Sequence, residues 1–237
     1  MGGTLSTLLV LMPGLDGTGD LFANFVSALR PCLNAKIVRY PRDHPLSYAD
    51  LFCHLVGAVP QSQPFVLVTE SFSTPLAVRM AATNPSNLKG LVISAGLIRN
   101  PVQWRLLRTK SLVQPWLFRI PPPRFVIEHF LIGKHAPREL RDEVCRTLRS
   151  VSAEALACRV RAVMTCDVRA DVARIRVPIL YLQGEHDQLV SKSSFEEIHM
   201  LKPDATLAVI NAPHLVLQRE PRKSADVVTR FVAELPS

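Results

Sequence analysis

The chain has 237 residues, 48% of them hydrophobic, and a formal net charge of +8. This length and composition suit one globular α/β domain with an insertion. Five irregularly spaced cysteines without a C-x-x-C pair argue against a zinc or redox site, and we interpret them as reduced thiols of a cytoplasmic protein. The first apolar run, Leu8–Met12, is too short to span a membrane and lacks the flanks of a signal peptide.

That run predicts the first buried strand, and a glycine-rich loop follows it at residues 13–19. Three glycines within six residues allow the backbone a tight path. The loop lacks the G-K-[ST] ending and the G-x-G-x-x-G spacing of phosphate-binding loops. We therefore favour a loop that presents a backbone N–H group to a neighbouring site, and phosphate binding is the alternative.

Helical and strand patterns then alternate. Apolar residues at helical spacing predict a helix over residues 20–29, and a strand is expected over 35–40. Ser47 is placed to cap a further helix, with Asp50 at the third helical position, and this helix is expected to reach Val59.

The segment Phe65–Val68 is a short apolar run that predicts a strand buried on both faces of a parallel sheet. The pattern then becomes helical, with Pro75 in the first turn, so that Ser71 lies in a sharp strand-to-helix turn. The surrounding sequence TESFS approximates G-x-S-x-G, the turn that exposes a nucleophilic serine. Thr69 departs from the small residue that is usual there. An ordinary serine at a helix start is the alternative.

The strand Leu88–Ser94 continues the alternation, which predicts a doubly wound parallel sheet. The alternation stops between residues 97 and 162, where helical patterns include Phe125–Ile132 and a helix that begins near Pro137. We interpret residues 97–162 as a helical insertion.

Strands are expected again over 179–183 and 205–210, and helices over 193–200 and 225–235. The core domain therefore comprises residues 1–96 and 163–237.

Asp187 and His214 follow the last two predicted strands, as Ser71 follows an earlier one. The carboxyl ends of parallel strands meet at one edge of a sheet, so we expect these three side chains to lie close together. A hydrolytic serine needs a base, and that base needs a carboxylate. Taken alone, Asp187 could be an ordinary turn residue and His214 an ordinary loop histidine. Their combination and order indicate a Ser-His-Asp triad.

With these residues the chain resembles the α/β-hydrolase superfamily over nearly its whole length. The resemblance is carried by residues 13–19, 68–73, 181–190 and 211–221. It implies a mostly parallel sheet of about six strands with helices on both faces, and it makes the insertion a cap. It also implies that the backbone N–H groups of Leu15 and Phe72 form an oxyanion hole, and that no cofactor or metal is needed.

The apolar residues of the insertion are candidates for an acyl pocket, although they could equally form the insertion's own core. The candidates are Leu106, Leu107, Trp116, Leu117, Phe125 and Phe130.

The segment Thr165–His214 is similar to methyl ester esterases that act on a carrier-bound pimeloyl chain. That resemblance implies a basic cap that holds an acidic carrier protein. Residues 99–161 contain 13 Lys or Arg and 5 Asp or Glu, so they hold the whole positive excess. The arginines concerned are Arg138, Arg141, Arg146, Arg149 and Arg159. A solvated basic face is the alternative, and nucleic acid is not expected.

These observations predict a carboxylic ester hydrolase that works through an acyl-enzyme on a small-molecule ester. A thioesterase, an acyltransferase or a hydrolase of carrier-linked esters would use the same residues. A ligand-binding relative without turnover is the alternative from another class.

Overall fold

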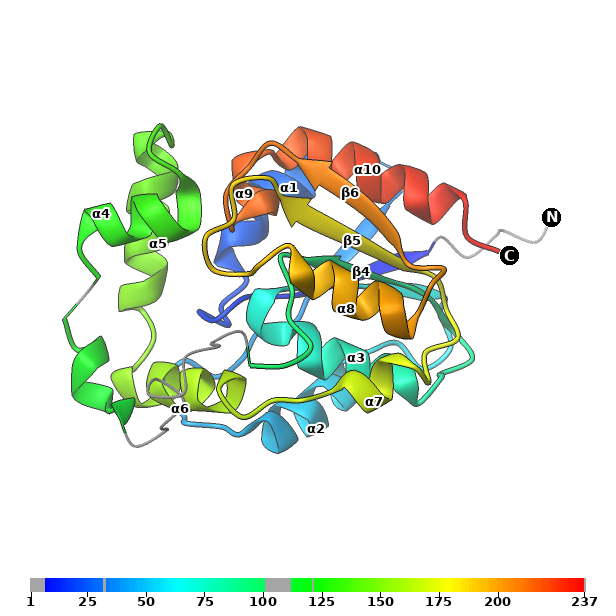
Figure 1. Cartoon of the computed structure of the whole chain (residues 1–237), viewed down its shortest axis with the longest axis horizontal. Coiled ribbons are helices and arrows are strands. Elements are labelled where there is room, and N and C mark those ends of the chain that lie inside the picture. The colour runs from blue at the N-terminus through cyan, green and yellow to red at the C-terminus, as the bar shows by residue number, and fades with distance from the viewer. Residues whose placement is uncertain (1–6, 32, 101–111, 121, 237) are drawn as a thin grey trace.

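The structure is a computed structural model that describes residues 7–31, 33–100, 112–120 and 122–236. Its centre is a parallel sheet of six strands in the order β2-β1-β3-β4-β5-β6 (Figure 1). The strands are β1 (Leu8–Met12), β2 (Asn34–Ile37), β3 (Phe65–Glu70), β4 (Leu88–Ser94), β5 (Ile179–Gly184) and β6 (Thr206–Ile210). The predicted parallel sheet of about six strands is confirmed.

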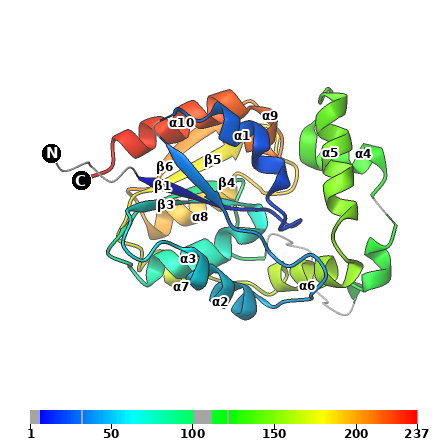
Figure 2. The same cartoon turned by 180° about the vertical axis from the view of Figure 1, so that it is seen from behind.

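Helices cover both faces of the sheet, as Figures 1 and 2 show. One face carries α2 (Tyr48–Ala58), α3 (Thr74–Ala82), α7 (Arg169–Val172) and α8 (Ser193–Leu201). The other carries α1 (Ala23–Ala28), α9 (Val216–Arg219) and α10 (Pro221–Ala233), with the short 3-10 turn η1 (Asp20–Phe22) leading into α1. The helix expected over 20–29 is thus a 3-10 turn followed by an α-helix, and the closing helix begins four residues earlier than expected.

The central strands are apolar on both sides because both faces of the sheet are covered. Every residue of β3 and β5 is buried. Leu67 packs into the core on the α2 and α3 side, whereas its neighbours Val66 and Val68 pack into the core beneath α1 and α10. This two-sided burial is what a continuous apolar run predicts for a parallel strand.

The start of α2 forms as its sequence predicts. The Ser47 side chain accepts a hydrogen bond from the Asp50 amide, and the Asp50 carboxylate accepts one from the Ser47 amide. This reciprocal pair satisfies donors that the first helical turn leaves without partners.

A helical segment made of the described residues 112–120 and 122–163 lies beside the sheet (Figures 1 and 2). It contains η5 (Pro115–Phe118), α4 (Arg124–Ile127), the π-helical turn η6 (Glu128–Ile132), α5 (Arg138–Arg149) and α6 (Ala153–Val163). The helices predicted over Phe125–Ile132 and from Pro137 onward are confirmed. The division into a core (1–96 and 163–237) and a cap (97–162) stays a prediction, and Leu106 and Leu107 lie outside the described residues.

Candidate active site

Ser71 lies at the turn between β3 and α3, in the short 3-10 helix η2 (Ser71–Ser73). Its φ is 47°, a left-handed conformation that is costly for a residue with a side chain. Such strain persists only where the surrounding structure holds it. Thr69, the departure from the usual small residue, is fully buried in β3, and its Oγ1 has no hydrogen-bond partner in the part of the chain that is described.

The structure brings Ser71, His214 and Asp187 together at the carboxyl edge of the sheet. His214 Nε2 lies 2.9 Å from Ser71 Oγ, and His214 Nδ1 lies 2.8 Å from Asp187 Oδ2. The other oxygen of Asp187 accepts hydrogen bonds from the amides of Leu189 (2.8 Å) and Val190 (3.0 Å). The carboxylate is therefore held in place, and it can in turn fix the orientation of the imidazole.

A glycine allows the Asp187 and His214 loops to meet. A Cβ on Gly184, at the end of β5, would lie only 2.7 Å from the Ala212 carbonyl oxygen and would also collide with that of Pro213. With glycine there, the His186 amide reaches the Ala212 carbonyl at 3.0 Å. The two loops thus lie in direct backbone contact, which brings the carboxylate to the imidazole.

The backbone groups predicted for the oxyanion hole lie beside the serine. Leu15 and Phe72 line the same cavity as Ser71 and His214. In the described part of the chain, the Leu15 amide donates to no other protein group. Tyr48 Oη donates to the Phe72 carbonyl (2.8 Å), and the Tyr48 and Phe72 rings stack with centroids 4.9 Å apart. Phe72, the residue after the serine, is therefore fixed through its ring and its carbonyl group.

The cavity has a volume of about 530 Å³ and is mostly apolar. Its apolar walls come from both the sheet edge and the helical segment, and include Leu21, Val144, Leu148, Val160, Leu189 and Leu215. A second cavity of about 730 Å³ lies within the helical segment, and Leu15, Leu131 and Leu148 line both. The two cavities therefore share a wall beside the proposed oxyanion loop.

The aromatic residues expected in the acyl pocket lie elsewhere. Trp116 and Phe125 have 62% and 70% of their surface exposed, and Phe130 packs on His129. None of the three lines the cavity beside Ser71, and Leu117 lines only the second cavity. Trp116 and Phe125 are turned outward and Phe130 is half-buried, whereas aliphatic side chains such as Val144 and Leu148 line the cavity beside Ser71.

Glu70 is a buried acid that the sequence analysis did not single out. It lines the cavity next to Ser71, is 1% exposed and accepts a hydrogen bond from Gln218 Nε2 at 2.7 Å. Burial raises the pKa of this carboxyl from 4.5 to about 7, and the negative charge of Asp16 adds to the effect. Its place beside the serine was visible in the sequence, but its burial and its distant partner were not.

The five arginines considered for a carrier surface differ in their environments. Arg138, Arg146 and Arg149 are exposed on α5. Arg141 is paired with Glu128 at 2.7 Å. Arg159 is 2% exposed and points into the protein, so it cannot contribute to a docking surface. Helical spacing carried a signal for this, because Arg159 lies three and four residues after the buried Leu156 and Ala155.

Comparison with known proteins identifies the family. The family model described as serine aminopeptidase, S33 (Hydrolase_4) matches residues 45–218. The chain belongs to this family. It is therefore an α/β-hydrolase, an enzyme of the esterase and hydrolase class, and the predicted superfamily resemblance is confirmed.

Relatives and solved structures agree with this family. A pimeloyl-[acyl-carrier protein] methyl ester esterase of Xanthomonas axonopodis pv. citri (strain 306) is 26% identical over 246 residues, covering 96% of each chain. The bromoperoxidase structure from Bacillus anthracis superposes with a TM-score of 0.80 at 17% identity, covering 97% of this chain and 92% of the other. The structure of MenH from S. aureus gives 0.77 at 13% identity, covering 98% and 95%. These two structures show the shared fold.

The described residues contain no candidate for a metal site or a membrane-spanning helix. No group of three or more His, Cys, Asp or Glu side chains could hold a metal ion. None of the described helices has the length and apolar character needed to cross a membrane. Cys53, Cys145, Cys158 and Cys166 are free thiols, and Cys32 lies outside the described residues.

Proposed function

We propose that the chain is a serine carboxylesterase that works through an acyl-enzyme intermediate. The observation that carries this proposal is the continuous series of contacts from Ser71 Oγ through the His214 ring to the Asp187 carboxylate, beside an apolar cavity. This arrangement supplies a nucleophile, a base within hydrogen-bond reach and a carboxylate that orients the base.

In the proposed mechanism, Ser71 Oγ attacks the acyl carbonyl carbon while His214 Nε2 takes the hydroxyl proton. Asp187 stabilises the imidazolium that forms. The amides of Leu15 and Phe72 donate to the oxyanion, and each such donor is typically worth about 3–4 kcal/mol of barrier. The imidazolium then gives its proton to the alkoxide, which leaves as the alcohol. Water attacks the acyl-enzyme by the same route and releases the acid.

The apolar cavity supports an acyl group of appreciable length. Its volume of about 530 Å³ lies within the range of small-molecule sites. Its polar lining residues are few, and those next to Ser71 in the sequence or in the site include Glu70 and His214. An aliphatic chain would therefore be desolvated along the helical segment while its carbonyl stays at Ser71.

The experiment is hydrolysis of p-nitrophenyl esters from acetyl to dodecanoyl by the native chain, Ser71→Ala and Ser73→Ala. Ser73 Oγ bonds to the Pro13 carbonyl and to Tyr40 Oη, so it is engaged away from the imidazole. We expect Ser71→Ala to lose activity by at least about a thousandfold and Ser73→Ala to keep it. Equal activity of Ser71→Ala and the native chain would contradict the proposal.

A second candidate keeps this chemistry and uses an ester attached to an acidic carrier protein. Arg138, Arg146 and Arg149 form an exposed basic face on α5, and Arg149 also lines the second cavity. The Xanthomonas axonopodis pv. citri relative is named as a methyl ester esterase of a pimeloyl group on an acyl-carrier protein. A carrier docked on this face would be close to the cavities of the helical segment.

This candidate is tested with the same acyl ester free and carrier-bound. Replacing the three arginines of the α5 face by glutamate should lower kcat/KM for the carrier-bound ester and leave the free ester unchanged. A matched triple, Arg222→Glu, Lys223→Glu and Arg230→Glu, changes exposed charges on α10, which lies outside the helical segment. Equal losses in the two triples, or no preference for the carrier-bound ester, would exclude the carrier.

A further inference from the structure

Arg159 is a buried cation that the proposed mechanism does not use. It lies on α6 and is among the largest fully buried side chains described. Placing a guanidinium out of water is costly unless its N–H groups and charge are satisfied. Its contacts therefore indicate what it stabilises.

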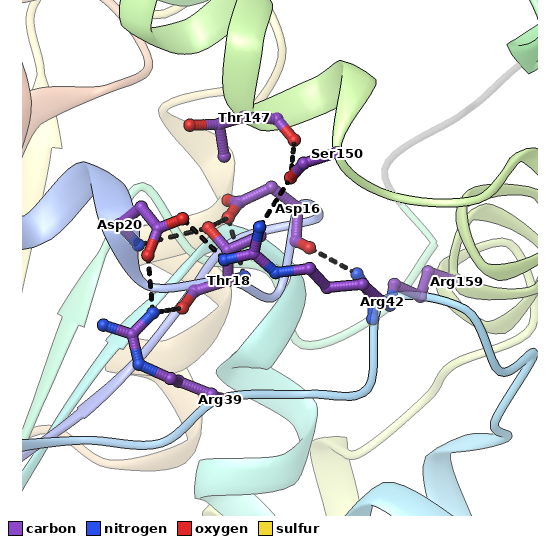
Figure 3. A network of polar contacts seen from close by, with 8 residues as sticks. All are labelled: Asp16, Thr18, Asp20, Arg39, Arg42, Thr147, Ser150 and Arg159. Carbon is purple, nitrogen blue, oxygen red and sulfur yellow. Dashed lines mark hydrogen bonds and ion pairs between the residues drawn. The ribbon is translucent and has the colours of Figure 1, made fainter.

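The guanidinium is held by backbone carbonyl groups. Nη1 donates to the carbonyl oxygens of Leu15 (3.0 Å) and Asp16 (2.5 Å), and Nη2 donates to that of Pro41 (2.8 Å). Its carbon atom lies 5.8 Å from the centre of the Tyr40 ring, within the range of a cation–π contact. Figure 3 shows the Arg159 side chain reaching the Asp16 backbone.

No carboxylate of the described residues lies within ion-pair distance of Arg159. The nearby exposed arginines do form such pairs, because Arg39 and Arg42 lie 2.6 and 2.7 Å from the two oxygens of Asp20. Arg39 also donates to the Thr18 carbonyl, but it keeps a carboxylate partner, whereas the hydrogen-bond partners of Arg159 among the described residues are main-chain carbonyls alone. This makes it specific for the path of the backbone at residues 15 and 16.

That backbone curves around the guanidinium. Gly17 has a φ of 68°, and a Cβ there would lie 2.6 Å from Arg159 Nη1. The Gly17 amide closes a turn on the Gly14 carbonyl at 3.1 Å, and its carbonyl accepts from the Tyr40 amide at 2.7 Å. The turn therefore encloses Leu15, whose amide is one of the two proposed oxyanion donors.

We propose that Arg159 is a positioning residue for the oxyanion hole. By holding the carbonyl groups of Leu15 and Asp16, it sets the direction of the Leu15 amide toward the cavity. It also fastens α6 of the helical segment to this loop, so that the helical segment and the loop hold one arrangement. This inference rests on the proposed esterase function.

A lysine cannot replace these contacts. Its ammonium is a single point of charge, whereas the arginine fork reaches Leu15 and Asp16 with one nitrogen and Pro41 with the other. Arg159→Lys should therefore keep the charge and lose the orientation of the loop. A donor misplaced by about an ångström can cost on the order of a hundredfold in rate.

The test compares Arg159→Lys with Arg42→Lys. Arg42 also links this region to the helical segment, through Ser150 at 3.0 Å, but its side-chain hydrogen bonds among the described residues go to Ser150 and Asp20 and not to Leu15 or Asp16. We expect kcat/KM of Arg159→Lys to fall about thirty- to a hundredfold through kcat, with KM within about twofold. A trifluoromethyl ketone, which forms a tetrahedral adduct, should bind weaker by the same factor. The product acid should bind unchanged, and Arg42→Lys should resemble the native chain.

Each outcome is decisive. Unchanged kcat/KM in a folded Arg159→Lys protein, or equal weakening of the ketone and the product acid, overturns the inference. If Arg159→Lys does not fold, as judged by circular dichroism, Arg159→Gln replaces it with the same expected results. If neither folds, Arg159 serves the fold and the inference is also overturned. Ser71→Ala is measured alongside, because native activity in that variant would instead overturn the proposed function.

Discussion

The carboxyl edge of the sheet and the helical segment hold their polar side chains by different means. At the edge, backbone geometry positions the side chains: Ser71 has a strained φ of 47°, and two main-chain amides donate hydrogen bonds to Asp187. In the helical segment a long side chain makes the contacts instead, since Arg159 reaches from α6 to the carbonyl groups of Leu15 and Asp16. Strand ends fix short side chains locally, whereas helices need long side chains to act at a distance.

The largest expected effect is loss of catalysis at the carboxyl edge of the sheet without a change in its structure. Asp187→Asn should leave the fold intact and lower kcat by about 10⁴-fold, because the amide no longer stabilises the imidazolium or fixes its tautomer. Steady-state ester hydrolysis measures this. Glu185→Gln changes an exposed carboxyl two residues away and should keep native activity. A comparable loss of activity in Glu185→Gln would show that catalysis does not depend specifically on the Asp187 carboxylate.

The next prediction concerns the backbone contact that brings the edge loops together. Gly184→Ala should lower the free energy of unfolding by about 3 kcal/mol, since the methyl group would collide with the carbonyls of Ala212 and Pro213. For a chain of this size the melting temperature should fall by about 6–12 °C. Gly57→Ala, in α2 with nothing near its Cβ position, should instead stabilise by up to about 1 kcal/mol. Similar melting temperatures for both variants would contradict this account.

Glu70 is a buried titratable group at the carboxyl edge of the sheet, so the stability of the edge should depend on pH. Its folded pKa of about 7 exceeds the ordinary value of 4.5, so the fold binds its proton more tightly than the unfolded chain does. The contribution of Glu70 to the free energy of unfolding is fully present below about pH 4.5, and it falls by about 3 kcal/mol as the pH rises through 7. Urea unfolding of Glu70→Gln should therefore show a smaller loss between pH 4.5 and 8 than the native chain. Parallel curves for the two proteins would be evidence against a buried, protonated Glu70.

The smallest effect tests the helical segment's contribution to the cavity. Leu148→Trp, which fills the wall shared by the two cavities, should lower kcat/KM for the dodecanoyl ester about tenfold and leave the acetyl ester within twofold. Phe125→Ala should change neither, because Phe125 is 70% exposed and outside both cavities. An unchanged chain-length profile in Leu148→Trp would mean that acyl chains do not pass Leu148.

The same difference between the two regions explains what the sequence could predict. Ser71, Asp187 and His214 could be placed together because parallel strands bring their carboxyl ends to one edge whatever the details of packing. The sheet and most helix bounds followed from apolar periodicity. The catalytic roles of Ser71, Asp187 and His214 stay a prediction.

The helical segment offered no such rule. The direction in which a helix presents Trp116 or Phe125 depends on packing against distant parts of the chain, and both side chains point outward. Charge counting treated Arg159 as part of a basic surface, although its partners lie more than a hundred residues away along the chain. Long-range contacts of this kind leave little trace in local patterns.

The measurement that tests the central claim most directly is covalent labelling with a p-nitrophenyl alkylphosphonate, followed by peptide mass spectrometry. A triad built on Ser71 should give one phosphonyl adduct per chain, on Ser71, with loss of esterase activity in proportion to labelling. The Ser71→Ala protein should remain unlabelled. An adduct on another residue that accounts for the lost activity, or full activity after Ser71 is labelled, would contradict the account.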